Sequence, residues 1–242
     1  MGPMGIRSRV PESVKQIARP VVWGVSDAVT KVRGDLMPPR RLVSQVPGDF
    51  RSVGRESLSH FRDLGSLRPD QRVLDIGCGP GRMAIPLTSY LSAPGSYEGV
   101  DTWREAVAWC DANIAPRFGN FRFRVIDALT ADGRAVFPYE DDSFDFAILC
   151  AISRLDKPTF SAYAREAGRV LRPGGRYFGT CLVSGDEPGD QPLCMSESDL
   201  RALLASAGLG VDALYPGSWN GHPTPLSYQD IVVATKVAQP AQ

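Results

Sequence analysis

Three glycines at every second position, Gly77, Gly79 and Gly81, follow an apolar run that contains an acid, Asp75, in the stretch VLDIGCGPG. Glycine is costly in conformational entropy, so this spacing indicates a backbone that turns tightly or lies against a ligand. A dinucleotide-binding loop has the form G-x-G-x-x-G with a small last residue. Here the last position is Arg82, and the Asp75 carboxylate would repel a pyrophosphate. The loop therefore favours a ligand with a cationic group near Asp75.

Two further acids, Asp101 and Asp127, end the next two apolar segments, YEGVD and FRFRVID. Parallel strands end at a common edge of the sheet, and α/β proteins bind their ligands there. A single acid at a strand end is most simply a helix N-cap, but three acids on three successive strands favour a ligand site. Carboxylates accept hydrogen bonds from ammonium, hydroxyl and amino groups. S-adenosylmethionine carries all three, so it fits this pattern better than a dinucleotide does.

The segments that must position these residues alternate between strand-like and helix-like patterns. Short apolar runs predict strands at 71–77, 97–101, 121–127, 144–151, 176–183, 210–216 and 228–237. Helical spacing, bounded by glycines or a serine cap, predicts helices at 55–65, 81–91, 103–114, 158–175 and 196–208. Regular alternation of the two is typical of a doubly wound α/β sheet.

Composition divides the chain into three parts. Residues 1–50 are rich in arginine and proline and contain an interrupted amphipathic pattern, so we expect a basic, partly helical extension. Residues 51–237 form the α/β domain, and residues 238–242 are expected to be a disordered tail. The extension would cover the core or a bound acceptor. Contact of residues 1–35 with a membrane surface is the less favoured alternative.

Charge and cysteine usage limit the class of partner. The formal net charge of the 242 residues is zero, so we expect no nucleic-acid partner. The five cysteines form no C-x-x-C pair and, with two histidines, give no metal-ligand spacing, so we expect neither a disulfide framework nor a metal. The N-terminus has no apolar core of signal-peptide length, and the expected location is the cytoplasm.

Two motifs in the right order resemble a known family. VLDIGCGPG resembles the first motif of the class I S-adenosylmethionine-dependent methyltransferases, and RVLRPGGRYF resembles the turn before their fifth strand. The resemblance covers about Arg51 to Val237. It implies a Rossmann-like seven-stranded sheet of order 3-2-1-4-5-7-6 with the last strand antiparallel, and S-adenosylmethionine as the cofactor. VGRESLSHFRDLG and GSWNGHPTPLSYQDIVVA are also similar to a bacterial subgroup of uncharacterised or glycan-associated methyltransferases.

The resemblance assigns the adenosine end of the cofactor to residues after the second and third strands. Asp101 matches the acid that accepts both ribose hydroxyls. Thr102 and Trp103 match positions that flank the adenine, while Asp127 and Ala128 match the acid and the backbone N–H that meet its edge.

The methionine end is assigned to Asp75, the glycine loop and the segment before the first strand. Arg51 and Gly54 lie where the family's N-terminal segment covers the cofactor, although Arg51 is equally interpreted as a solvated side chain. Arg82 belongs either to this anion site or only to the first turn of a helix. The complete set of expected cofactor-binding residues is Asp75, Gly77, Cys78, Gly79, Gly81, Asp101, Thr102, Trp103, Asp127, Ala128, Arg51 and Gly54.

A hydroxyl acceptor needs a base close to the reacting oxygen. Members of the similar subgroup often carry a histidine after the fourth strand, where this chain has Leu155. His60 lies in a predicted helix and is interpreted as a packing or surface residue, whereas His222 lies in the loop GSWNGHPTPLS on the acceptor side. We hypothesise that His222 is the base and that Arg154 positions the acceptor.

These expectations leave three functions to compare. The favoured one is transfer of a methyl group to a hydroxyl of a small molecule, glycan or glycolipid. The second is a non-catalytic S-adenosylmethionine-binding subunit or regulator, which the departure at Leu155 motivates. The third, an NAD-dependent oxidoreductase, is disfavoured by Arg82 at the small-residue position. The sequence does not predict the oligomeric state.

Overall fold

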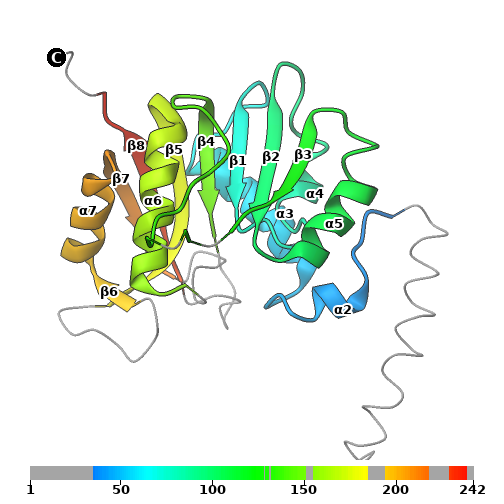
Figure 1. Ribbon diagram of the computed structural model, residues 1–242, viewed down its shortest axis with the longest axis horizontal. Coiled ribbons are helices and arrows are strands. Elements are labelled where there is room, and N and C mark those ends of the chain that lie inside the picture. The colour runs from blue at the N-terminus through cyan, green and yellow to red at the C-terminus, as the bar shows by residue number, and fades with distance from the viewer. Residues whose placement is uncertain are drawn as a thin grey trace, which may run out of the picture. The chain divides into compact units, whose positions relative to one another are not determined.

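The computed structural model describes residues 35–127, 129–130, 132–150, 155–184, 194–217 and 229–238. The chain divides into two units, Met1–Val46 and Pro47–Gln242. The described part of the first unit holds one short helix, α2 (Arg40–Val43). The other described helices and strands belong to the second unit (Figure 1).

The second unit is built on a mixed sheet. Its strands are β1 (Arg72–Ile76), β2 (Ser96–Asp101), β3 (Phe121–Val125), β4 (Phe144–Leu149), β5 (Leu171–Ser184), β6 (Cys194–Ser196), β7 (Leu209–Tyr215) and β8 (Asp230–Lys236). Their order is β3-β2-β1-β4-β5-β8-β7, with β6 beside β5. The pairs from β3 to β5 are parallel, and β8 is antiparallel to both of its neighbours. The short β6 was not predicted, so the predicted sixth and seventh strands are β7 and β8 here. With that renumbering the observed order is the expected 3-2-1-4-5-7-6, and the predicted fold class is confirmed.

Helices cover both faces of this sheet, with α6 and α7 on one face and α3 and α4 on the other (Figure 1). Their bounds, with that of α5, are α3 (Phe50–Asp63), α4 (Ala84–Leu87), α5 (Arg104–Asn113), α6 (Lys157–Val170) and α7 (Glu197–Ser206). On the first face Phe160 of α6 and Leu200 of α7 are fully buried in the apolar core. On the second face Phe61 of α3 packs edge-on against Phe146 and Phe178 of the sheet.

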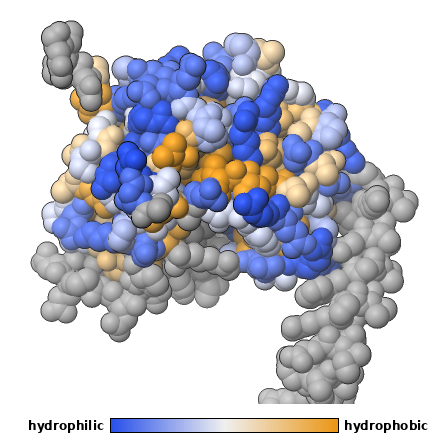
Figure 2. All heavy atoms as spheres, viewed as in Figure 1, coloured by the Kyte–Doolittle hydropathy of each residue, from blue (hydrophilic) through white to orange (hydrophobic). Residues whose placement is uncertain are grey.

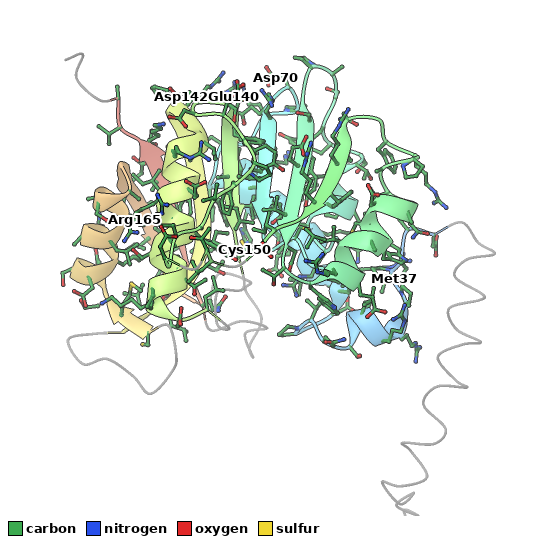
Figure 3. All side chains as sticks on the ribbon, viewed as in Figure 1. Met37, Asp70, Glu140, Asp142, Cys150 and Arg165 are labelled. Atoms are coloured by element: carbon green, nitrogen blue, oxygen red, sulfur yellow. The ribbon has the colours of Figure 1, made fainter. Side chains whose placement is uncertain are left out.

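Strand direction decides which edge of the sheet carries the predicted site. Figure 3 shows Asp70 and Asp142, which precede β1 and β4, at one edge and Cys150, which follows β4, at the opposite edge. Strands β1, β2 and β3 run parallel to β4, so they end at the edge where Cys150 lies. The glycine loop, Asp101 at the end of β2 and Asp127 after β3 therefore share this edge.

The helix after the glycine loop is shorter than predicted. Turns occupy residues 79–83, and α4 then covers only Ala84–Leu87 of the expected 81–91. Pro86 within it removes one backbone donor, which disfavours a longer helix. A helix of four residues is too short to provide an anion site at its N-terminus.

The end of α6 also differs from the prediction. The helix ends at Val170, and the Pro173-Gly174-Gly175 turn lies within β5, with Gly174 at φ +76°. The predicted serine cap of α7 is confirmed, because Ser196 Oγ accepts a hydrogen bond from the Asp199 N–H at 3.1 Å.

The surface of the viewed face is mostly polar, with a smaller apolar area near its centre (Figure 2). Within the described residues, Val136 and Val237 are the large apolar side chains that stand exposed, at 59% and 58%. In the described part of the chain, no helix combines the length and the apolar character that a membrane crossing requires.

Candidate functional site

The glycine loop leaves β1 in a left-handed conformation. Gly77, Gly79 and Gly81 have φ values of +82°, +50° and +82°, which residues with side chains rarely adopt. The N–H groups of Gly77 and Cys78 donate to the carbonyl of Val100 in β2 at 2.8 and 3.1 Å. The loop therefore turns over the end of the neighbouring strand.

The three glycines serve two different purposes. A Cβ at Gly77 would meet no atom within 4 Å, and a Cβ at Gly79 would have a single neighbour at 3.9 Å. A Cβ at Gly81 would lie 3.0 Å from both Cys110 of α5 and Ile114 at its end. Gly77 and Gly79 thus leave space for a ligand against the main chain, whereas Gly81 lets α5 pack closely against the loop.

Asp101 joins the glycine loop to the end of β2. Its Oδ2 accepts a hydrogen bond from the Gly79 N–H at 2.7 Å, and its Oδ1 accepts one from the Trp103 N–H at 2.8 Å. Each carboxylate oxygen has a second acceptor position. The half-buried Asp101 therefore holds the loop and retains the acceptor capacity that a diol requires.

Asp75 is 2% exposed and lies beneath the same loop. The hydroxyl of Tyr97 donates to its Oδ2 at 2.5 Å. Burial raises the pKa of Asp75 to about 7, with Asp101 adding to the effect, while the Tyr97 hydrogen bond and the Arg82 guanidinium oppose it. A cationic ligand group at this position would stabilise the ionised form of Asp75.

Asp127 completes the row of carboxylates. The N–H of Ile126 donates to the main-chain carbonyl of Asp101 at 3.0 Å, so the chain after β3 runs beside the end of β2. Asp127 is exposed, and no hydrogen bond or ion pair among the described residues engages its carboxylate. Directly after Asp101 in the sequence, Thr102 is exposed and Trp103 is half-buried. The structure thus places the three predicted acids along one edge, in the order of their strands.

Two predicted cofactor residues have a packing role in the structure. The Cys78 side chain is buried against β2, where a Cβ at Gly99 would lie 3.0 Å from its sulfur, and burial raises the pKa of its thiol. A Cβ at Gly54 would lie 2.5 Å from the carbonyl oxygen of Arg82, so this glycine lets α3 approach the residue after the loop. Arg51 is exposed in the first turn of α3.

The structure describes only part of the expected adenine and acceptor sites. Ala128, Arg154 and His222 lie outside the described residues, so their roles stay predictions. Leu155 packs against the apolar core at the position where the similar subgroup often has a histidine. Asp156 beside it caps α6, accepting a hydrogen bond from the Thr159 N–H at 2.9 Å.

Sequence reasoning missed Tyr97, the hydrogen-bond partner of Asp75. The available signal is strand parity, because Tyr97 pairs with Val73 and Gly99 pairs with Asp75 in the parallel β1–β2 ladder. Residues two apart in a strand share a face of the sheet. Tyr97 and Gly99 therefore lie on the same face of the sheet as Asp75. Because Gly99 has no side chain, the long side chain of Tyr97 can reach the Asp75 carboxylate.

Comparison with known proteins supports a methyltransferase domain. Residues 73–175 match the family described as methyltransferase domain. Phthiotriol/phenolphthiotriol dimycocerosates methyltransferase 1 of Mycobacterium ulcerans (strain Agy99) is 33% identical over 133 residues, which cover 55% of this chain and 45% of that protein. O-methyltransferase cnsE of Penicillium expansum is 28% identical over 209 residues, which cover 77% of this chain and 69% of that protein. The chain thus spans less than half the length of the mycobacterial relative.

A solved structure shows the same architecture. Burkholderia thailandensis 1,6-didemethyltoxoflavin-N1-methyltransferase, with bound 1,6-didemethyltoxoflavin and S-adenosylhomocysteine, aligns with a TM-score of 0.58 over 98% of this chain and 94% of that chain. At 22% identity this likeness shows the fold alone. The sheet order, the glycine loop and the family match over residues 73–175 together support a class I methyltransferase domain with S-adenosylmethionine as its cofactor.

Proposed function

We propose that the protein transfers a methyl group from S-adenosylmethionine to a hydroxyl of a small molecule, glycan or glycolipid. The observation that carries the cofactor half of this proposal is the open glycine loop at Gly77 and Gly79, held by Asp101 through a 2.7 Å hydrogen bond. Open space against a left-handed main chain is what a ligand pressed on the backbone requires.

Each carboxylate supports a separate contact with the cofactor. Asp75 is buried and would gain from the α-ammonium, Asp101 has acceptor positions for the ribose hydroxyls, and the exposed Asp127 would accept from the adenine amino group. When bound, S-adenosylmethionine supplies the methyl group and the sulfonium charge that makes it reactive. The residues of this chain hold and orient the reactants and exclude water.

The hydroxyl acceptor is supported by the relatives and by the chemistry of the acceptor loop. One relative is named an O-methyltransferase, and another is named for phthiotriol and phenolphthiotriol dimycocerosates. In this transfer an O–C bond forms while the S–C bond breaks, and the hydroxyl proton passes to a base. We assign His222 as that base and Arg154 as the group that positions the acceptor.

Calorimetric titration tests the cofactor half. We expect S-adenosylmethionine and S-adenosylhomocysteine to bind the wild type and to bind Asp101→Ala at least tenfold more weakly, since that variant loses a charged acceptor. Asp70→Ala, on the opposite edge of the sheet, is the matched control and is expected to bind as the wild type does (Figure 3). Absence of binding by the wild type would remove the proposed cofactor site.

Transfer of a labelled methyl group tests the acceptor half. A panel of hydroxyl, amine and thiol acceptors is incubated with the wild type and with His222→Ala. The proposal expects label in a hydroxyl acceptor and its loss in the variant. Label confined to amines or thiols would contradict the hydroxyl assignment, and wild-type turnover by His222→Ala would contradict the base.

The second candidate is a cofactor-binding subunit without catalysis. It is favoured by Leu155, whose side chain packs on the core instead of presenting a base after β4. This candidate expects cofactor binding in the calorimeter but no labelled product with any acceptor. Product from one acceptor is enough to reject it.

A further inference from the structure

Arg82 follows the glycine loop and is half-buried. Its Nη1 donates to the carbonyl of Pro47 at 2.7 Å. Within the described residues no other hydrogen bond and no ion pair engages this guanidinium, which has five N–H donors. Most of the donor capacity of Arg82 is therefore open to a ligand.

The surroundings place the Arg82 guanidinium at the predicted cofactor edge. Burial lowers its pKa, an effect that the nearby Cys150 thiol and Asp75 carboxylate oppose. Asp75 belongs to β1 and Cys150 follows β4, the adjacent strand, at the edge where the glycine loop lies (Figure 3). Arg82 itself follows the glycine loop after β1, so its guanidinium lies within electrostatic reach of the groups that end both strands.

Arg82 and Asp75 are opposite charges that do not pair with each other. They influence each other's pKa, but no ion pair within 4.0 Å joins them in the described part of the chain. Partly buried charges are costly unless each finds a counter-charge. A ligand that carries both an ammonium and a carboxylate on one carbon would supply both counter-charges at once.

We propose that Arg82 binds the α-carboxylate of S-adenosylmethionine while Asp75 binds its α-ammonium. This inference rests on the cofactor site proposed above. A guanidinium presents paired N–H groups that match the two oxygens of a carboxylate, which makes such a contact strong and directional.

The fold holds Arg82 at both its head and its stem, and Arg51 is the other candidate for this contact. Pro47 holds the head of the Arg82 side chain, and Gly54 lets α3 approach its stem so that a Cβ there would lie 3.6 Å from Cγ of Arg82. Arg51 is exposed in the first turn of α3. A side chain that is already held loses less conformational entropy when it binds a ligand.

Three ligands separate a carboxylate contact from a structural role. S-adenosylmethionine has the carboxylate, decarboxylated S-adenosylmethionine lacks only that group, and 5′-methylthioadenosine lacks the whole amino-acid end. We expect the wild type to prefer the first over the second by about 10- to 100-fold, as for hydrogen bonds to a charged group. In Arg82→Met this preference should fall to within about threefold, while 5′-methylthioadenosine binds both proteins equally.

Calorimetry on the full chain measures these affinities, with Arg122→Met as the matched control. Arg122 is an exposed arginine of β3 that also donates to a backbone carbonyl, that of Gly119. The control should keep the wild-type preference. Where Arg82→Met does not fold, as judged by thermal unfolding, Arg82→Gln removes the charge with a polar side chain and is expected to lose the preference as well.

Several results would overturn the inference. Equal weakening of all three ligands by Arg82→Met would assign Arg82 a structural role only. A preference that survives in Arg82→Met but disappears in Arg51→Met would move the contact to Arg51. If the wild type binds none of the three ligands, the proposed cofactor site fails and the inference fails with it. Wild-type binding with an unchanged preference in the Arg82 variants refutes only the inference.

Discussion

The main-chain N–H of Gly79 donates to Oδ2 of Asp101 across 2.7 Å, so the loop after β1 and the end of β2 are joined by a charged acceptor. The other oxygen of Asp101 accepts from the Trp103 N–H at 2.8 Å. One side chain therefore orders the main chain on both sides of the proposed ribose position.

Asp101→Asn should lower the stability of the domain as well as its affinity for the cofactor. An amide has one oxygen and cannot accept from both N–H groups, so we expect the free energy of unfolding to fall by about 1–3 kcal/mol. Urea unfolding followed by circular dichroism measures it. Asp70→Asn serves as control, because the interaction of Asp70 in the described part of the chain is a surface ion pair with Arg68. Equal stability of Asp101→Asn and the wild type would show that the loop does not depend on this carboxylate.

Alanine substitutions should separate the two purposes of the glycines. Gly77 and Gly81 share a φ of +82°, so alanine is strained by about 1–2 kcal/mol at either position. At Gly81 the new Cβ also meets Cys110 and Ile114 at 3.0 Å, whereas at Gly77 it meets open space. We therefore expect Gly81→Ala to lower the melting temperature more than Gly77→Ala.

Cofactor binding should show the reverse order. Among variants that remain folded at the assay temperature, Gly77→Ala should weaken S-adenosylhomocysteine binding more than Gly81→Ala does for the same loss of stability. The Cβ at Gly77 enters the open space in which we propose that the ligand lies. Thermal unfolding and calorimetry on the same samples give both quantities. A Gly77→Ala variant that binds normally would show that the ligand does not contact this part of the main chain.

The sequence predicted the fold and the row of acids because both depend on local pattern and strand order. An apolar run followed by a glycine loop, and acids at successive strand ends, define the edge on which Asp75, Asp101 and Asp127 gather. Parallel β1, β2 and β3 then bring these acids together whatever the helices do.

The remaining features depend on contacts between distant segments, which local pattern does not report. Gly54 is expected at the cofactor, and its close approach to the carbonyl of Arg82, 28 positions later in the chain, is visible only in the structure. Gly81 belongs to the expected cofactor set, and the close approach of α5 to it is visible only in the structure. The helix at 81–91 was predicted from apolar spacing, which continues through the turns on either side of α4.

Cofactor affinity should depend on pH through Asp75, whose folded-state pKa is raised to about 7. If the ammonium binds the ionised carboxylate, affinity rises with pH up to about 7, by close to tenfold per unit where Asp75 is mostly protonated. Above about pH 8 the α-amino group of the cofactor loses its own proton and affinity falls again. Calorimetric titration between pH 5.5 and 8.5 should therefore give a maximum.

The same pKa shift has a defined sign for stability. The folded state holds the Asp75 proton more tightly than the unfolded chain, so this group makes unfolding easier as pH rises from about 4 toward 7 and contributes no further change above that. Asp75→Asn should remove this slope and the pH dependence of cofactor binding below 7. Binding of 5′-methylthioadenosine, which has no ammonium, should change little across the range. A pH-independent affinity for S-adenosylmethionine would contradict the ammonium contact.

Two fully buried tyrosines should respond in opposite directions to loss of their hydroxyl groups. Tyr97 donates to Asp75 at 2.5 Å, whereas the buried hydroxyl of Tyr177 has no hydrogen-bond partner within the described part of the chain. Tyr97→Phe leaves a buried carboxyl without its donor and should cost about 1–3 kcal/mol of unfolding free energy. Tyr177→Phe removes an unpaired polar atom and should leave stability unchanged or raise it by about 1 kcal/mol.

Urea unfolding of the two variants at one pH checks this contrast, because both changes remove the same atom from the same residue type. Loss of stability in Tyr177→Phe would mean that an ordered water satisfies the hydroxyl, since buried waters fill such positions. In Tyr97→Phe the pKa of Asp75 should also rise, because the tyrosine hydrogen bond opposes the effect of burial. The cofactor-affinity maximum would then move to higher pH. A stability loss without that movement would separate the packing role of Tyr97 from its role in charging Asp75.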